Sequence, residues 1–526
     1  MSSLTYIKTG RPEFDNMIPT IQGFLAKDTM DMVMDGRKIR GYRSPDAPSI
    51  WIRDHSDMMR GFRHFEEDMF SATLHFAETQ GMNGRIFDYF TTSPEKVPCE
   101  KENWAKYVRV PVEADVEYRF IKAAFIAWQA TGDDATIEGL IPHMEKALEY
   151  AFSHPWRWDS ERQLVKRAYT IDSWDFAYSA GHHDWLQFQI DDNTFWGILH
   201  GDNSGFYEAC LQLAQIYRYF DRGERAAHWE NFAAGLKSRM NQLCWNGSFY
   251  THFVKMTPVE IDGVDEASQL SFSNAMNINR GVCDYPQAVS ILNTYLRRRK
   301  ETSAFAEWFS IDPPFPDGVF GDEKIVGGAY CNGGIMPLVG GELARAYLEH
   351  GMESHGIETL RQYHGLIYEK NETYLWYFPN GEPSSIDKST SPDAMPTDGW
   401  GSSAMLYGAI EGLAGVQDYG RLFDAWKLAP RWYHAGVDEA EVGVGYACSE
   451  TGVAYSYRWD SNGIGIEVEG PASTIQAAIP VPADAAVRKV QIDGSDIEFG
   501  DSLIGDSRYL KFDLSIEKGA KVRVDL

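Results

Sequence analysis

The sequence predicts a mainly α-helical protein with a small β domain at its C-terminal end. We expect an (α/α)6 toroid of helical hairpins over residues 1–434 and an antiparallel β-sandwich over residues 435–526. Two observations lead to this fold class: paired segments of helical periodicity in the first part, and a change to alternating apolar and polar residues near residue 435. At 526 residues the chain is also too long for one ordinary core.

Segments with helical periodicity come in pairs. Apolar residues in 205–220 recur at the i, i+3, i+4, i+7 spacing of one helix face, and 224–244 repeats the pattern after a short turn. The other helical segments are 113–131 with 134–152, 334–350 with 354–368, and a last stretch at 418–428. A hairpin cannot bury both faces by itself, so about six hairpins should close into a ring. The long loops would then gather at one end and line a cleft.

The C-terminal part has the pattern of an antiparallel sandwich. Segments 442–470, 487–499 and 509–526 alternate apolar and polar residues between Gly, Asp and Asn turns. We therefore place the domain boundary near 430–436.

Composition narrows the class of function. The chain has 49 Lys and Arg against 76 Asp and Glu, a net charge of −27, which disfavours binding to nucleic acid or to an anionic membrane surface. Its six cysteines form no CxxC pair, so zinc ribbons and redox dithiols are not indicated. No signal peptide and no apolar run of about 18 residues is visible, so the expected location is the cytoplasm. We expect no metal and no organic cofactor.

Aromatic residues are abundant. The chain holds 16 Trp, 27 Tyr and 28 Phe, which is 13% of all residues. Flat aromatic faces stack on sugar rings, although large helical cores also use aromatic residues. A carbohydrate substrate is one of the two interpretations of this composition.

The first polar motif consists of Trp51, Arg53 and Asp54 at the start of an expected helix. An Arg beside an Asp can bind neighbouring sugar hydroxyls, with Asp accepting and Arg donating hydrogen bonds. Alternatively, Asp54 caps the helix and Arg53 is solvated.

The second motif lies in the loop before the helix at 203–220. Asp172 and Asp175 flank Trp174 there, and two carboxylates among aromatic residues are poor core material. A carboxyl with a raised pKa is what protonation of a glycosidic oxygen requires. The alternative is a turn in which the Asp side chains cap the backbone.

Two further motifs are rich in glycine and in carboxylates. Tyr330 and Asn332 lie in the glycine-rich stretch 327–334, which matches neither a Walker nor a Rossmann fingerprint. After an aromatic run at 376–378, four carboxylates follow before Trp400, namely Glu382, Asp387, Asp393 and Asp398. At least one of them could be a general base, while the others would be solvated loop residues.

Together these motifs resemble the six-hairpin glycosidases, the group that includes neutral invertases, trehalases and processing α-glucosidases. The resemblance covers roughly residues 50–415 as a pattern. The stretch from Trp51 to Asp54 looks like the first-loop element of that group, which holds the sugar in the −1 subsite. The stretch from Tyr330 to Gly334 is similar to the sugar-contacting Tyr-His-Asn-Gly-Gly loop of invertases.

The resemblance also implies catalytic residues. The stretch from Asp172 to Phe176 is similar to the trehalase pattern Glu-Ser-Gly-Trp-Asp-Phe, in which the last Asp is the general acid, so Asp175 is implied. The Asp-Ser pair of invertases would instead select Asp172. In the relatives a Glu base precedes the aromatic run, but Trp376 stands there in this chain. Counting back from Trp400 implies Glu382 as the base.

The expected function is an inverting exo-glycosidase that acts on a small glycoside or oligosaccharide. Asp175 or Asp172 would act as the acid and Glu382 as the base, with Asp398 next in line. Arg53, Asp54, Asn332, Trp174 and Trp400 would bind the terminal sugar. Alternatives on the same toroid are a glycoside phosphorylase, which replaces the base with a phosphate site, and a sugar epimerase with a histidine pair such as His182 and His183. A lyase acting on acidic sugars would want a cationic pocket, which the acidic composition does not indicate, and a non-enzymatic carbohydrate-binding protein is the remaining alternative.

Overall fold

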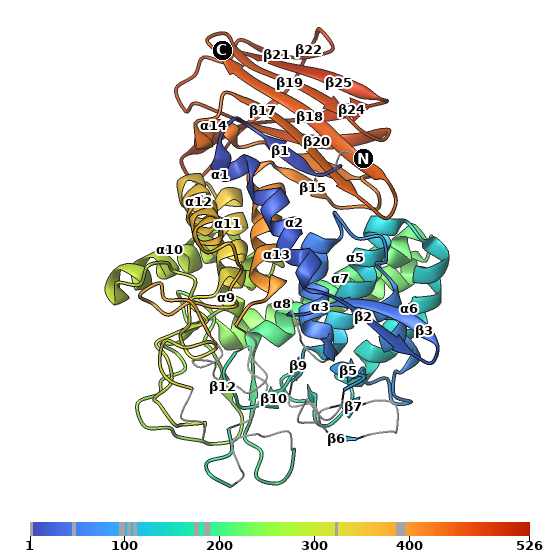
Figure 1. The fold of residues 1–526 in the computed structure, drawn as a ribbon, viewed down its shortest axis with the longest axis vertical. Helices are drawn as coiled ribbons and strands as arrows, with labels where there is room; N and C mark the ends of the chain where they lie inside the picture. The colour runs from blue at the N-terminus through green and yellow to red at the C-terminus, as the bar shows by residue number, and fades with distance from the viewer. Residues whose placement is uncertain are drawn as a thin grey trace.

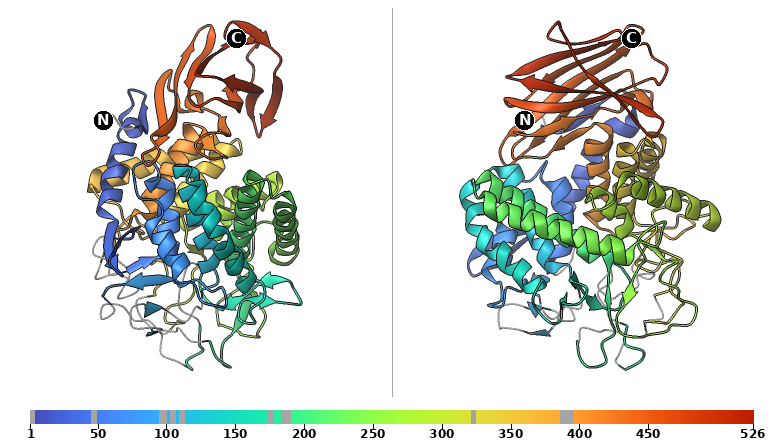
Figure 2. Two further views of the ribbon diagram at one scale, coloured as in Figure 1. Left: turned by 90° about the vertical axis from the view of Figure 1, so that its right-hand side faces the viewer. Right: turned by 180° about the vertical axis from the view of Figure 1, so that it is seen from behind.

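A computed structural model describes most of the chain. The described residues are 4–44, 49–93, 100–101, 107–108, 113–172, 178–182, 190–320, 325–385 and 396–526. Helices occupy the middle of the molecule, and a β region covers one end of them (Figure 1). The two other views show the same stacking of the β region on the helices (Figure 2).

Six helices of the described chain contact one another in cyclic order. They are α3 (Ile52–Phe62), α5 (Val116–Thr131), α7 (His200–Tyr219), α9 (Ser273–Asn279), α11 (Pro337–Glu349) and α13 (Gly399–Tyr407). Each packs against the next, and α13 packs against α3. Gly341 allows the close approach of α11 to α13, because a Cβ there would overlap the backbone of Ala404. This cyclic order is consistent with the expected toroid.

Other helices lie against these six. They are α2 (Met17–Lys27), α4 (Ser71–Glu78), α6 (Asp134–Ala151), α8 (Gly223–Cys244), α10 (Tyr285–Thr302) and α12 (Glu353–Lys370). The hairpins α5–α6, α7–α8 and α11–α12 follow the periodicity of the sequence, and α2 packs on α13. The short α1 (Pro12–Asp15), α14 (Trp432–Ala435) and the π-helical turn η3 (Gly408–Leu413) complete the described helices.

The β region consists of two sheets. Their strands are β1 (Tyr6–Lys8), β15 (Val416–Asp418), β16 (Trp426–Leu428), β17 (Glu439–Tyr446), β18 (Thr451–Asp460), β19 (Gly463–Glu469), β20 (Ser473–Val481), β21 (Lys489–Ile492), β22 (Ser495–Ile497), β23 (Gly500–Ile504), β24 (Ser507–Ile516) and β25 (Gly519–Asp525). The seven-stranded sheet has the order β1-β17-β18-β19-β25-β21-β22, and the five-stranded sheet has the order β15-β16-β20-β24-β23. The pairing is antiparallel except between β16 and β20. An antiparallel C-terminal β region is therefore confirmed.

The structure corrects the prediction of a helix at 418–428. This segment forms the antiparallel pair β15 and β16 instead. The Asp418 carboxylate accepts hydrogen bonds from the backbone N–H groups of Gly420 and Phe423, both at 3.0 Å, and closes the turn between the strands. Phe423 has a φ of 60°, which a continuing helix would not tolerate. Strands from outside 435–526, namely β1, β15 and β16, thus contribute to the sheets.

Short strands decorate the helical part. They are β2 (Thr29–Met34), β3 (Arg37–Tyr42), β4 (Ser49–Trp51), β5 (Tyr89–Thr91), β6 (Glu100–Lys101), β7 (Tyr107–Val108), β8 (Trp158–Asp159), β9 (Leu164–Val165), β10 (Arg167–Ala168), β11 (Trp196–Ile198), β12 (Val254–Lys255), β13 (Leu270–Ser271) and β14 (Ile311–Asp312). Their ladders are antiparallel. Strands β5, β6, β7, β9, β10 and β12 lie toward the end of the helices opposite the β region (Figure 1).

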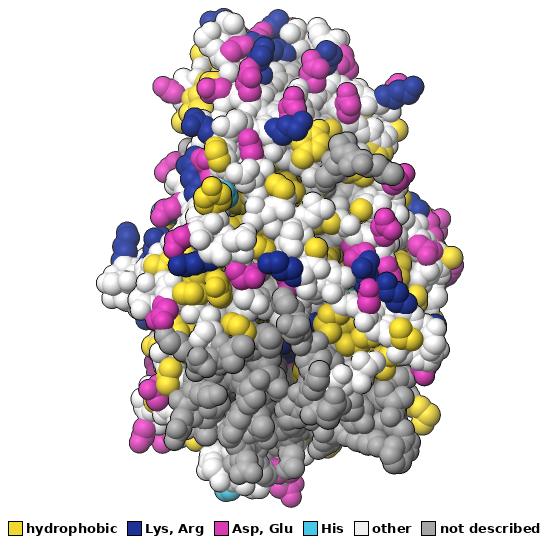
Figure 3. All heavy atoms as spheres, in the orientation of Figure 1, with side chains coloured by type: hydrophobic (Ala, Val, Ile, Leu, Met, Phe, Trp, Pro, Cys, Tyr) yellow, Lys and Arg dark blue, Asp and Glu magenta, His cyan; other side chains and the backbone are white. Residues whose placement is uncertain are grey.

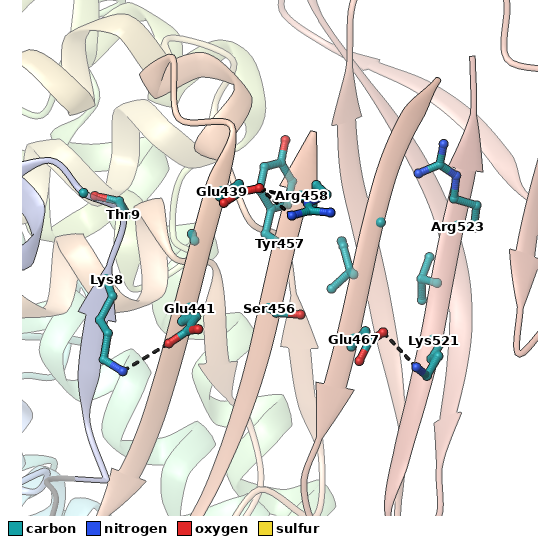
Figure 4. Close-up of a pocket in the computed structure, with 15 residues that line it drawn as sticks. Lys8, Thr9, Glu439, Glu441, Ser456, Tyr457, Arg458, Glu467, Lys521 and Arg523 are labelled. Carbon is teal, nitrogen blue, oxygen red and sulfur yellow. Dashed lines mark hydrogen bonds and ion pairs between the residues drawn. The ribbon is translucent and has the colours of Figure 1, made fainter. Parts of the chain in front are cut away.

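Charged side chains on the surface are mixed in sign. On the face shown in Figure 3, acidic side chains are scattered among Lys and Arg over both the β region and the helices. The outer face of the seven-stranded sheet forms a hollow of about 760 Å³. Ion pairs cross it from strand to strand, such as Lys8 with Glu441 at 3.1 Å and Lys521 with Glu467 at 2.8 Å (Figure 4).

Candidate active site

Polar and charged side chains gather where the helices of the ring begin. Arg53 and Asp54 lie in the first turn of α3, Asp115 precedes α5, Asp202 lies in the first turn of α7, and Asp398 caps α13. Helix N-termini carry unpaired N–H groups and the positive end of the helix dipole, which favours carboxylates there. Long loops lead into each of these helices, so the sequence brings carboxylates and loops to one end of the ring.

A chain of buried charges links α3, α5 and α13. Arg53 donates from Nε and Nη2 to the two carboxylate oxygens of Asp115, at 2.7 and 2.9 Å. Arg119 contacts Asp115 at 3.4 Å and donates to Asp57 Oδ2 at 2.6 Å. Trp400 donates from Nε1 to the same Asp57 oxygen at 2.8 Å. Arg53 and Trp400, both predicted as sugar-binding residues, thus belong to one network.

The cations of this buried network keep two carboxylates ionised. Burial by itself would raise the pKa of Asp57, but Arg119 and Lys122 override this effect and hold the pKa well below its usual range. Burial likewise acts to raise the pKa of Asp115, and the ion pair with Arg53 outweighs it, so this pKa is also lowered. Both residues are therefore anions that position cations rather than proton donors.

Asp202 is also a buried carboxyl, but its pKa is raised and not lowered. Its Oδ1 lies 3.5 Å from Arg167 Nη1, and its Oδ2 has no hydrogen-bond partner among the described residues. Burial raises its pKa to about 6, and the negative charges of Asp115 and Asp172 act in the same direction against Arg167. A carboxyl with this pKa holds a proton over part of the neutral range, as a general acid must.

Asp172 lies next to this group and is held by α9. Its carboxylate accepts hydrogen bonds from Ser273 Oγ at 2.9 Å and from the Ser273 N–H at 3.1 Å. Its own N–H donates to His252 Nε2 at 3.0 Å. A Cβ at Gly201 would overlap Ser273 Oγ, so only glycine lets the start of α7 approach the Asp172–Ser273 pair.

Several predicted residues lie outside the described part of the chain. They are Trp174, Asp175, His183, Asp387 and Asp393. Their roles stay predictions.

Asp398 is also buried, at the start of α13. Its Oδ1 accepts a hydrogen bond from the Trp400 N–H at 2.5 Å, and its Oδ2 accepts one from Ser44 Oγ at 3.3 Å. Arg43 contacts Asp54 and lies 4.0 Å from Asp398. Burial raises the pKa of Asp398, while Arg43 opposes this shift. Asp54 and Asp398 are thus joined through one guanidinium group.

The remaining predicted residues have local partners. Trp51 is half-buried and its ring lies 4.2 Å from that of Tyr89. Asn332 is buried, and its side-chain amide bonds to both the N–H and the C=O of Phe315, at 2.7 and 3.0 Å. Tyr330 has a φ of 43°, and its carbonyl accepts a hydrogen bond from Ser310 Oγ at 2.7 Å.

Glu382 lies at the surface. Its side chain is exposed, and its carbonyl accepts a hydrogen bond from the Phe378 N–H at 2.8 Å within the turn of residues 378–382. Its own N–H donates to Asn380 Oδ1 at 3.0 Å in the same turn. Glu382 thus belongs to a surface turn, whereas Arg53, Asp172 and Asp398 are held at the helix starts.

Sequence reasoning misses several members of the network. Asp57, Asp115, Arg119 and Asp202 are not predicted, because each lies within or beside a segment assigned to a helix and not to a loop. One signal was available for Asp202. The stretch from Leu199 to Ser204 groups four polar residues, His200, Asp202, Asn203 and Ser204, directly before the amphipathic segment 205–220.

The described residues carry no sign of a metal centre or of a membrane helix. No cluster of three or more His, Cys, Asp or Glu side chains suited to a metal ion occurs within the described ranges. In the same part of the chain, no helix combines the length and the apolar character that crossing a membrane requires.

Comparison with known proteins identifies glycoside hydrolases among structures with this fold. The α-L-rhamnosidase from Dictyoglumus thermophilum matches with a TM-score of 0.56 and 13% identity, over 99% of this chain and 50% of its own. The GH78 family rhamnosidase of Bacillus sp. GL1 matches with a TM-score of 0.59 and 13% identity, over 91% and 43%. The GH63 mannosylglycerate hydrolase from Thermus thermophilus has a TM-score of 0.50 and 12% identity, over 75% and 99%.

These matches show a shared fold of helices with a β region. The chain spans half the length of the first rhamnosidase and less than half of the second. No protein-family model and no curated protein sequence matches the chain.

Proposed function

We propose that this chain is a glycoside hydrolase whose catalytic centre lies where the helices of an (α/α)6 toroid begin. The observation that carries the proposal is the buried carboxyl of Asp202 beside Arg167, whose pKa of about 6 keeps it partly protonated. Hydrolysis of a glycosidic bond needs one carboxyl that holds a proton and another that is ionised. The fold shared with two rhamnosidases and a mannosylglycerate hydrolase supports the same reaction class.

Proton donation to the leaving oxygen is proposed for a carboxyl of this cluster. Asp202 is supported by its environment, because its pKa of about 6 keeps it partly protonated near neutral pH. Asp175 is supported by the similarity to the trehalase pattern, and Asp172 by the Asp-Ser pair. Single Asn substitutions at these three positions show which residue is the acid. Loss of the acid should lower the turnover of natural glycosides more than that of aryl glycosides with good leaving groups.

Activation of water is proposed for Asp398 ahead of Glu382. An inverting mechanism needs the two carboxyls about 6.5–9.5 Å apart with water between them. Asp398 is buried and is joined to Asp54 through Arg43, whereas Glu382 is exposed in a surface turn. Asp398 also caps α13, so Asp398→Asn, which can still accept the capping hydrogen bond, is the variant to use.

Binding of the terminal sugar is proposed for Trp51, Arg53 and Asp54 at the start of α3. Trp51 and Arg53 are half-buried and Asp54 is buried. Arg53 and Asp54 already have charged partners that fix their orientation. Trp400 and Asn332 are buried, and their polar atoms form hydrogen bonds within the protein. Their proposed role in sugar binding is therefore indirect, by holding other parts of the site in place. We propose that the enzyme is exo-acting and that its substrate is a small glycoside or oligosaccharide.

The proposal is tested by a screen of natural disaccharides and aryl glycosides, each assayed with and without inorganic phosphate. Hydrolysis without phosphate, with the first-formed anomer followed by NMR, supports the proposal and gives the stereochemical outcome. Turnover that requires phosphate would instead identify a phosphorylase. Interconversion of free sugars without bond cleavage would identify an epimerase.

A further inference from the structure

A second polar site lies where the six helices of the ring face one another. A small cavity of about 20 Å³ is lined from every one of them. Its lining residues are Arg60 of α3, Lys122 of α5, Glu208 of α7, Met276, Asn279 and Arg280 at the end of α9, Glu342 of α11 and Tyr407 of α13. A volume of this size holds one water molecule or one monatomic ion. The cavity therefore lies among all six helices rather than in a groove between two of them.

The lining carries more positive than negative charge. Arg60, Lys122 and Arg280 face the cavity with two carboxylates, Glu208 and Glu342. Glu342 is already committed, because it pairs with Arg60 and accepts a hydrogen bond from Asn279 at 2.6 Å. Glu208 lies 3.6 Å from Arg280 and is the more exposed of the two carboxylates. Behind the lining, Lys122 also pairs with Asp57, which is linked through Arg119 and Asp115 to Arg53. With these partners included, five cations meet four carboxylates, so one positive charge remains in excess.

Two of the cations are incompletely neutralised. Arg60 is buried, and its Nη2 has no hydrogen-bond partner among the described residues. A guanidinium group can only donate hydrogen bonds, so this nitrogen requires an acceptor. Burial lowers the pKa of Lys122 to about 8, and the positive charges of Arg60 and Arg119 add to this effect despite the ion pair with Asp57. Arg60 thus offers an unused hydrogen-bond donor, and Lys122 is a desolvated cation.

We propose that this cavity binds one small monovalent anion of the size of chloride. An anion supplies the acceptor that Arg60 Nη2 lacks and offsets the excess positive charge, whereas a water molecule does only the first. The volume excludes phosphate, sulfate and organic anions. The site is separate from the proposed catalytic carboxyls and stands whether or not the chain hydrolyses glycosides.

The direct test uses the full chain crystallised or soaked in sodium bromide. Bromide scatters anomalously, so an ion in the cavity gives an anomalous peak within hydrogen-bond distance of Arg60. A peak there supports the proposal. An anomalous map without a peak at that position, with a water molecule in the cavity, overturns it.

Solution measurements test the same site without crystals. Thermal unfolding is compared in sodium chloride and in sodium gluconate at equal ionic strength. At a tenfold excess of chloride over its dissociation constant, we expect the melting temperature to rise by roughly 1 °C, since the unfolding entropy of a chain of this length is large. Identical melting curves in both salts would contradict the proposal.

Two variants and a matched control assign the effect to the cavity. Arg60→Met should weaken halide binding at least about tenfold, as expected for a lost charged hydrogen bond. Glu208→Gln removes a lining carboxylate and should strengthen it at least about threefold. Glu467→Gln removes an exposed carboxylate of the outer sheet and should leave it unchanged. If Arg60→Met does not fold, the difference between Glu208→Gln and Glu467→Gln decides, and equal halide affinities in these two variants would contradict the proposal.

Discussion

The outer face of the seven-stranded sheet and the start of the ring helices are both rich in charge, yet they use it differently. On the sheet, Lys521 and Glu467 pair with side chains that are 71% and 62% exposed. Deeper in the ring, beyond the first turns of α3 and α5, Arg119 and Asp57 pair with side chains that are 2% and 0% exposed. On the sheet, Lys8–Glu441 and Lys521–Glu467 are separate pairs between neighbouring strands (Figure 4), whereas the buried charges form one connected network.

The difference lies in how strongly each charge depends on its partner. Exposed pairs exchange contacts with water and contribute little. Buried ions have lost their hydration, so each depends on its partners, and removal of one partner leaves the others uncompensated. A protein retains such a network where fixed charges are needed, and this dependence can be measured at both regions.

The largest effect is expected at the centre of the buried network. Asp57→Asn leaves Arg119 and Lys122 without their carboxylate and should lower the free energy of unfolding by about 3–5 kcal/mol. Chemical denaturation at pH 7 measures this loss.

The pH dependence of Asp57 follows from its lowered pKa. A group with a depressed folded-state pKa stabilises the protein above its unfolded pKa of about 4 and loses this contribution as the pH falls. The difference between Asp57→Asn and the unchanged protein should therefore narrow on acidification below about pH 4. A constant difference down to about pH 3 would show that Asp57 is not held as an anion.

The next effect concerns catalysis by Asp202. If Asp202 is the acid, Asp202→Asn should lower turnover of natural glycosides by at least about 10²-fold. The free energy of unfolding should not fall along with the activity. The pKa of Asp202 is raised in the folded protein, so its ionised form destabilises the fold as the pH rises through about 6. Relative to the unchanged protein, Asp202→Asn should be more stable at about pH 8 than at about pH 5.

The control for this experiment lies in the same cluster. Asp172→Asn removes a neighbouring carboxylate that bonds to Ser273. Full activity of Asp202→Asn together with inactive Asp172→Asn or Asp175→Asn would move the role of acid to the loop of residues 172–175.

A smaller effect is expected in the pH profile. An acid with a pKa of about 6 must be protonated to act, so kcat/KM should fall about tenfold per pH unit above that value. In Asp202→Asn, the residual kcat/KM should no longer fall with pH above about 6. A limb that is unchanged in this variant would belong to another group.

Local sequence patterns predict the helices of this fold well. The segment 134–152 is expected to be a helix, and α6 occupies Asp134–Ala151. The segment 418–428 fails because its apolar spacing also fits two short strands, and the turn at Asp418 decides between them. Pairing of β1 with β17 joins residues more than 430 positions apart, and no local pattern encodes such a contact.

The candidate site is predicted less completely, for a physical reason. Arg53, Asp54, Asp172 and Asp398 are recognised by their motifs, and the structure joins them to partners such as Arg43 and Asp115. The pKa of Asp202 depends on burial and on charges from three other segments, which appear only once the helices pack. Residue type and spacing therefore indicate candidate residues, while the protonation states of the buried carboxyls follow from the fold.

The smallest effect is expected on the outer sheet. Glu467→Gln removes the partner of Lys521 from a pair in which both side chains are mostly in water. Solvent and salt screen this pair, so the free energy of unfolding should hardly change, and added salt should reduce the change further. Lys8 and Glu441 offer a second pair of the same exposure, and Glu441→Gln should behave alike. A loss in either variant that approaches the loss in Asp57→Asn would mean that the sheet charges act as a connected network, and the contrast with the helix starts would fail.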